Sequence, residues 1–180
     1  MAVINVFLAD LPRTIRWPSP IRSTLQNYFN RVLQAIGGFD SAYVQWRSQV
    51  PSLGPSDLLA YLVLDPDDSV VKALGKKPKS DQDGLTKQSS MGTGSEVYFD
   101  RMQEEPRLIA NLIFHEFMHN ISGLDDAGLH NKPNISLGKE TVEGGDDLSQ
   151  GDINVLRPKF RAKRKQWTGG YLYYHDPFRK

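Results

Sequence analysis

The five residues His115-Glu116-Phe117-Met118-His119 have the types and the spacing of a catalytic metal site. Two imidazoles four positions apart lie one turn apart on the same face of a helix, so both can bind one metal ion. The intervening Glu116 is then placed to take a proton from a water molecule bound to that ion. This HExxH arrangement is typical of zinc peptidases. It predicts His115 and His119 as metal ligands and Glu116 as the general base.

The residues around the motif indicate a helix that is largely buried. Apolar side chains recur at every fourth position in a stripe formed by Ile109, Ile113, Phe117 and Ile121. Pro106 is a favourable first helical residue and Gly123 a typical stop, so we expect a helix from Pro106 to Ser122. Buried polar groups without partners cost free energy. A metal ion supplies the partner that two histidines in register on such a helix require.

The absence of cysteine restricts how a metal ion can be held. The chain of 180 residues contains no Cys, so disulfides are excluded and the ligands must be His and carboxylate groups. The 22 Lys and Arg residues balance 21 Asp and Glu, which gives no overall charge that favours nucleic acid or a membrane surface. No apolar run is long enough to span a bilayer, and the first residues lack the basic start of a signal peptide. We expect a protein without a nucleic-acid partner that is cytoplasmic or exported by a non-classical route.

The order of the expected elements favours one α+β domain over residues 1–180. Strands are predicted at residues 3–8, 42–48, 58–64 (buried and central) and 96–100. Helices are predicted at residues 23–36 (after a proline-rich turn that includes Pro20), 106–122 and 148–156. We expect a small mixed sheet and a central helix that carries the motif. Residues 67–94 are expected to form an exposed loop or a pair of short elements, and residues 123–147 an irregular segment. The strand at 96–100 is either a site for an extended peptide or an ordinary edge strand.

A catalytic zinc ion usually has three protein ligands, so the motif leaves one unassigned. Gly123 can turn the chain sharply, after which Asp126 can return to the metal ion, and Asp126 is our first choice. His130 is the chemically easier zinc ligand but requires a longer excursion of the chain. Asp125 is a third candidate, and Glu140 and Glu143 are more distant ones.

A family resemblance is carried by three segments of the chain. These are GSEVYFD at residues 94–100, the HEFMH motif, and the Gly123-Leu124-Asp125-Asp126 stretch that follows it. Together they resemble the metzincin clan of zinc peptidases, most closely the matrixin-type catalytic domains, over residues 94–156. The resemblance implies a metzincin-like fold, one catalytic Zn²⁺ ion, and a peptide or protein substrate.

The chain departs from that family in the surroundings of the motif. One extra residue separates His119 from Gly123, and an Asp stands where the family has its third His. No Met follows Met118, so the methionine turn of the clan is absent or is built from residues such as Ile135 and Leu137. The resemblance therefore carries over to the motif itself and not to the third ligand.

These observations predict a zinc-dependent endopeptidase in which Glu116 deprotonates a metal-activated water that attacks the peptide carbonyl. Candidates for a second group that stabilises the oxyanion are Tyr171, Tyr173, Tyr174 and His130. Two competing hypotheses are a bacterial toxin or effector metalloprotease with a narrow protein target, and an inactive module that binds metal or peptide. Glu116 argues against the inactive module, because a purely structural metal site needs no base. The C-terminal segment 157–180 is basic and aromatic, and its basic run 157–165 is typical of a solvated face.

Overall fold

The computed structural model describes residues 3–11, 19–99, 106–131, 148–160, 165–175 and 177, without the side chains of residues 19–21. Within these ranges the chain forms five strands, which are β1 (Val3–Ala9), β2 (Ser41–Arg47), β3 (Leu58–Val63), β4 (Gly84–Ser89) and β5 (Gly92–Tyr98). The helices are α1 (Ser19–Ile36), α2 (Pro106–Ser122), α3 (Asp126–His130), α4 (Gln150–Leu156) and α5 (Gly170–Tyr174). Two short 3-10 helices, η1 (Pro66–Asp68) and η2 (Val71–Leu74), follow β3. This mixture agrees with the predicted α+β class.

The strands form one mixed sheet in the order β2-β1-β3-β5-β4. The first four are parallel, and β4 is antiparallel to β5. The central strand is β3, and all six of its residues are buried, as its continuous apolar sequence predicts. The strand expected at residues 96–100 corresponds to β5, which lies inside the sheet between β3 and β4. Both predictions for this strand, a site for an extended peptide and an ordinary edge strand, are therefore wrong. The edge of the sheet is formed by β4 instead.

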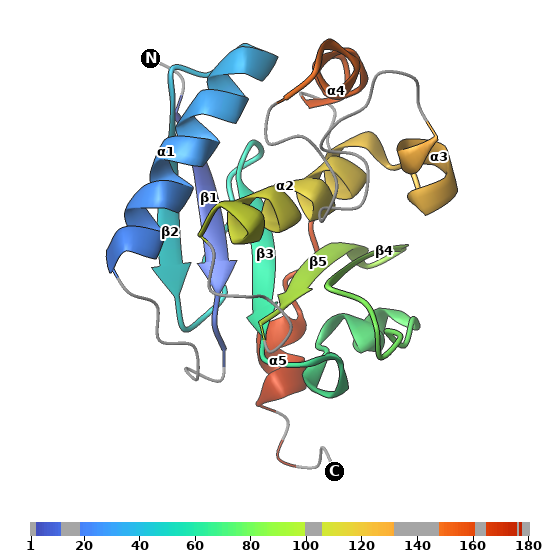
Figure 1. The fold of residues 1–180 in the computed structure, drawn as a ribbon. Helices are drawn as coiled ribbons and strands as arrows, with labels where there is room; N and C mark the ends of the chain where they lie inside the picture. Colours follow the sequence, from blue (N-terminus) through green and yellow to red (C-terminus); the bar gives the residue numbers. More distant parts are fainter. Residues whose placement is uncertain are drawn as a thin grey trace.

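Each face of the sheet is covered by its own apolar core. Alternate residues of β3 point to opposite faces, so Leu62 joins the core under α1 and α2, whereas Tyr61 joins a second core with Trp167 and η2. Figure 1 shows α1 and α2 lying across the same face of the sheet and α5 at its lower end. The motif helix α2 therefore packs against the sheet, and its C-terminal end, at His119 and Gly123, borders a cleft.

The helix that carries the motif has the bounds expected from its sequence. It begins at Pro106 and ends at Ser122, and Gly123 adopts the left-handed conformation (φ 71°) that stops a helix. Helix α4 begins with a capping box formed by Ser149 and Asp152, whose spacing can be read from the sequence. The first helix starts at Ser19, earlier than expected. Its first turn tolerates Pro20, because the N–H that proline lacks would have no helical partner there.

Residues 67–94 agree with the alternative of short elements rather than with one exposed loop. Residues 84–94 form β4, a tight turn and the start of β5. Glycine, serine and threonine in this stretch hide the alternation of apolar and polar side chains that marks a strand. Gly94 is buried because Leu74, Val71 and Trp167 pack where its side chain would be, a long-range contact that periodicity does not reveal.

Two residues of the basic run stabilise helix ends. Arg157 donates from Nε to the Ile36 carbonyl at 2.6 Å and from Nη2 to Ala35 at 3.1 Å, and Lys159 Nζ donates to the Ser122 carbonyl at 2.9 Å. Cations at helix C-termini satisfy carbonyls that lack a helical partner and oppose the helix dipole. Residues 161–164 of the run lie outside the described residues. No helix in the described part of the chain is both long and apolar enough to cross a bilayer.

Candidate metal centre

The two histidines of the motif face each other on α2. The Nε2 atoms of His115 and His119 are 3.2 Å apart, and each residue is only 5% exposed. Their four-residue spacing places them one turn apart, and burial of the rest of α2 fixes the rotation of the helix about its axis. Both rings therefore point to the same place at the end of the cleft.

A third histidine reaches the same place through a turn and a short helix. Gly123 reverses the chain, α3 runs from Asp126 to His130, and buried Leu129 anchors it. As a result, His130 Nε2 lies 3.3 Å from His115 Nε2. Candidate ligand atoms of His115, His119 and His130 all lie within 4.8 Å of one another, so a single metal ion could contact all three. The prediction that residues 123–147 are irregular is wrong for α3, and residues 132–147 lie outside the described residues.

A backbone hydrogen bond fixes the ring of His119 for metal binding. Its Nδ1 lies 2.8 Å from the carbonyl oxygen of Leu124, which can only accept, so Nδ1 carries the proton and donates it. The Nε2 lone pair is then directed at the other two histidines. Burial also lowers the pKa of His119 and favours the neutral ring, which is the form that binds metal ions. The turn at Gly123 thus supplies the partner that orients the ring of His119, as is usual for histidines that bind metal ions.

The aspartates after Gly123 take other positions. The side chain of Asp125 caps α3 by accepting a hydrogen bond from the Gly128 amide at 2.8 Å. Asp126 is 68% exposed at the rim, with its Oδ1 3.6 Å from His119 Nε2, and it is not among the clustered ligand atoms. The clustered ligand atoms therefore include His130, the second choice, whereas Asp126, the first choice, approaches His119 without joining the cluster. Glu140 and Glu143, like Ile135 and Leu137, lie outside the described residues.

Glu116 is held against strand β4 beneath the histidines. It is 4% exposed, and the Thr86 hydroxyl donates to its Oε2 at 2.6 Å. Gly84 leaves the space for this carboxylate, since a Cβ there would lie 2.6 Å from Glu116 Oε1. Burial raises the pKa of Glu116 to about 8; the Thr86 hydrogen bond lowers it, and the charge of Asp126 raises it. A proton is therefore readily gained or lost by this group near neutral pH.

A chain of polar side chains behind Glu116 was not anticipated from the sequence. The Thr86 hydroxyl lies 3.0 Å from Ser95 Oγ, which accepts a hydrogen bond from Asn120 Nδ2 at 3.2 Å. Ser95 and Asn120 are fully buried. These contacts join β4, β5 and α2, so they exist only after the sheet has formed. The sole signal in the sequence was a run of small polar residues, which is equally typical of a loop.

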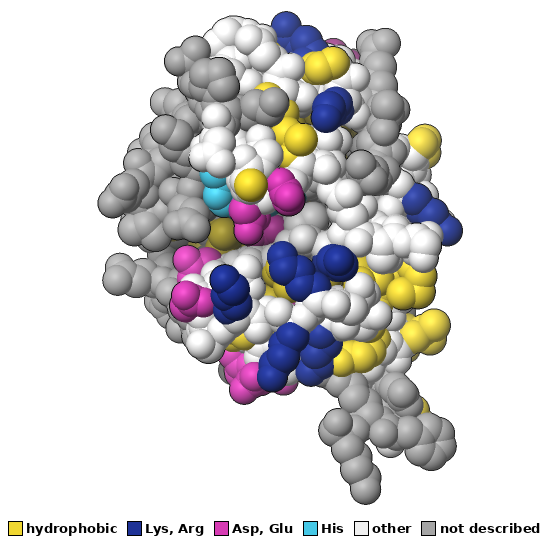
Figure 2. Space-filling view, turned by 90° about the vertical axis from the view of Figure 1, so that its right-hand side faces the viewer, with side chains coloured by type: hydrophobic (Ala, Val, Ile, Leu, Met, Phe, Trp, Pro, Cys, Tyr) yellow, Lys and Arg dark blue, Asp and Glu magenta, His cyan; other side chains and the backbone are white. Residues whose placement is uncertain are grey.

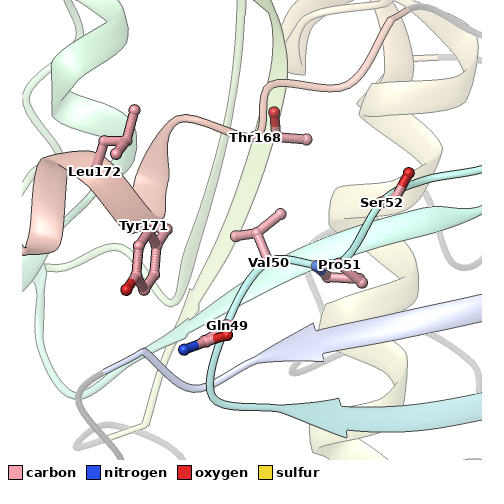
Figure 3. A pocket seen from close by; sticks show the side chains of 7 residues that line it. All are labelled: Gln49, Val50, Pro51, Ser52, Thr168, Tyr171 and Leu172. Atoms are coloured by element: carbon pink, nitrogen blue, oxygen red, sulfur yellow. The ribbon is translucent and has the colours of Figure 1, made fainter.

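The three tyrosines proposed as oxyanion donors lie elsewhere. Tyr171, Tyr173 and Tyr174 belong to α5 and pack against the second core, on the face of the sheet opposite α2. Tyr171 lines a separate cavity of about 290 Å³ together with Leu172 and residues 49–52, as Figure 3 shows. The alternation of β3 explains this position, because the Tyr61 hydroxyl, on that face, accepts a hydrogen bond from the Gly170 amide. These tyrosines are therefore excluded from the neighbourhood of the histidines.

A cleft of about 520 Å³ opens beside the metal centre. One wall is formed by His119 and residues 123–126, and the other by Lys76 and the β4 residues Thr86, Lys87 and Gln88. Figure 2 shows this face of the molecule, with a histidine and acidic side chains above the groove and a cluster of Lys and Arg below it. The metal centre is thus reachable from solvent through a groove that runs past the outer edge of β4.

In comparisons with known proteins, no protein-family model, no curated protein and no solved structure matches this chain. The centre is therefore interpreted from its own geometry: three converging imidazoles, a buried carboxylic acid next to them and an open groove.

Proposed function

We propose that this protein is a zinc-dependent endopeptidase of metzincin-like type, in which His115, His119 and His130 hold the metal ion. The observation that carries the proposal is the convergence of three imidazoles on one place, two of them from the helix that also carries Glu116. His130 replaces Asp126 as the expected third ligand, because its nitrogen belongs to the cluster whereas the Asp126 carboxylate lies at the exposed rim.

The spacing of the nitrogen atoms supports zinc as the metal ion. Imidazole nitrogens bound at 2.0–2.1 Å in tetrahedral geometry lie about 3.3–3.4 Å apart. The two Nε2 separations from His115, 3.2 and 3.3 Å, are compatible with this value. Three neutral imidazoles are a usual ligand set of catalytic zinc, and His119, which would hold the ion, lines the cleft.

The roles of the side chains follow from their positions. Zinc, when bound, supplies Lewis acidity that makes a water molecule in the cleft more acidic. A cation held by the three histidines would favour the carboxylate form of Glu116, whose pKa burial otherwise raises to about 8. In that form Glu116 would accept a proton from the attacking water and pass it to the nitrogen of the leaving amine. Thr86 holds the Glu116 carboxylate in place, and the Leu124 carbonyl keeps the His119 proton on Nδ1.

Strand β4 offers a binding edge for an extended peptide. It pairs with β5 on one side, and no described strand pairs with its other side. Its residues Thr86, Lys87 and Gln88 line the cleft beside His119. A substrate added as another strand would gain backbone hydrogen bonds and would cross the cleft past the metal centre, which suits a peptide better than a small amide.

The proposal is tested by metal analysis together with three variants. Wild type and Glu116→Gln should each bind about one zinc ion per chain, and only wild type should cleave a panel of unfolded proteins and peptides. His130→Ala should lose zinc, whereas Asp126→Ala, the matched control at the rim, should retain it. Zinc binding without cleavage by wild type across the panel would favour a binding module. Retention of zinc by His130→Ala would refute the proposed ligand set.

A further inference from the structure

The two walls of the cleft carry opposite charges. The wall on the side of α2 and α3 contains Asp125 and Asp126, whereas the wall on the side of β4 contains Lys76 and Lys87. A substrate in the groove therefore lies between an anionic and a cationic surface. A negatively charged group on the substrate is repelled by the first wall and attracted by the second.

Lys76 is placed at the cleft by a rigid support. It follows η2, whose residues Val71 and Leu74 are buried, and Gly75, whose φ of 87° turns the chain toward the cleft. The preceding segment is tied to the sheet by buried Glu96, which accepts hydrogen bonds from the Val70 and Val71 amides at 3.0 and 3.1 Å. The backbone that carries Lys76 is thus fixed from below by β5 rather than being a free loop.

The side chain of Lys76 is available to a ligand in the cleft, which it lines together with His119. Lys76 is half-buried, and it makes no hydrogen bond or ion pair with any residue in the described ranges. A partly desolvated cation beside an open cleft binds a carboxylate more strongly than a fully hydrated one does, because less water must be removed.

On the basis of the peptidase function proposed above, we infer that Lys76 determines specificity by binding a carboxylate of the peptide substrate next to the metal centre. Two sources offer this chemistry: an acidic side chain near the scissile bond, or the C-terminal carboxylate of a short product-side segment. Both place one negative charge on the cationic wall. They differ in whether the bond that is cut lies inside a chain or near its end.

Binding of metal-anchored peptides to the zinc-loaded protein separates the two sources without relying on turnover. One series carries a C-terminal hydroxamate and either Glu or Gln at successive positions. A second series carries an N-terminal malonyl hydroxamate, again with Glu or Gln, and ends in a free carboxylate or an amide. Affinities are measured by isothermal titration calorimetry for wild type, Lys76→Gln and Lys76→Arg. Lys77→Gln is the matched control, because Lys77 is the exposed neighbour and does not line the cleft.

We expect the charged member of at least one pair to bind wild type and Lys77→Gln about tenfold more tightly than its neutral partner. Lys76→Gln should abolish that preference and Lys76→Arg should retain it, with zinc content and melting temperature unchanged. A preference in the Glu–Gln pairs identifies a side chain, and one in the carboxylate–amide pairs identifies the chain end. Equal binding within every pair, or a preference that survives in Lys76→Gln, overturns the inference while leaving the peptidase proposal intact. Failure of wild type to bind zinc overturns both.

Discussion

Replacement of Glu116 by Gln should change how the stability of the metal-free protein depends on pH. Burial raises the pKa of Glu116 from its ordinary 4.5 to about 8 in the folded protein. Between these values the native state holds a proton that the unfolded chain has released. The free energy of unfolding therefore falls as pH rises. The contribution of Glu116 is fully present below about pH 4.5 and is lost as pH passes about 8.

The size of the effect follows from the same shift. At 1.36 kcal/mol per pKa unit, a rise from 4.5 to about 8 corresponds to about 5 kcal/mol in total. Most of it, about 4 kcal/mol, is lost between roughly pH 5 and 8.5. The amide introduced by Glu116→Gln would remain neutral throughout, and its carbonyl can still accept the hydrogen bond from Thr86. The variant should therefore become more stable than wild type as pH rises.

The assay is urea unfolding followed by tryptophan fluorescence, with a chelator present, at a series of pH values. The quantity compared is the difference in unfolding free energy between wild type and Glu116→Gln. His119 has a lowered pKa, so it makes both proteins more stable as pH rises, and this contribution cancels in the difference. If the two proteins lose or gain stability in parallel from pH 5 to 8.5, Glu116 is not a buried acid and the reasoning fails. Adding zinc should reduce the difference, because a nearby cation favours the ionised form.

Three further outcomes are expected. Chelation of zinc should lower the melting temperature by about 5–10 °C, since a ligand at 100 times its Kd stabilises a fold by about 2.7 kcal/mol. An unchanged melting temperature would argue against a native metal site. Thr86→Val keeps the shape of the side chain but removes the hydroxyl bonded to Glu116, so it should lower kcat about 10- to 100-fold with zinc retained. Thr86→Ser should restore kcat. Equal rates in wild type and Thr86→Val would show that this hydrogen bond does not position the base. Arg157→Met should lower the free energy of unfolding by about 1 kcal/mol, because the hydrogen bonds from Arg157 to the end of α1 are lost. Arg157→Lys should be intermediate, as measured by urea denaturation. No loss would mean that solvent satisfies these carbonyls equally well.

The parts of this molecule that its sequence predicted are those fixed by local geometry. Helical periodicity placed His115 and His119 on one face of α2 and gave both ends of that helix, because hydrogen bonds within a helix join residues only four positions apart. The capping box of α4 is local in the same way, because its two residues are three positions apart. The burial of β3 was predictable for another reason, because a continuous apolar strand needs packing on both faces.

The rest of the candidate site was decided by tertiary contacts. His130 rather than Asp126 joins the motif because α3, anchored by Leu129, sets how far the chain travels after Gly123. The environment of Glu116 is supplied by Thr86, some 30 positions away, across a strand whose small polar residues gave no periodic signal. The aromatic residues of α5 were assigned to the site on their chemistry alone, and the sheet placed them on its other face. Spacing along a helix determines which side chains share a face, whereas the packing of distant segments determines what those side chains meet.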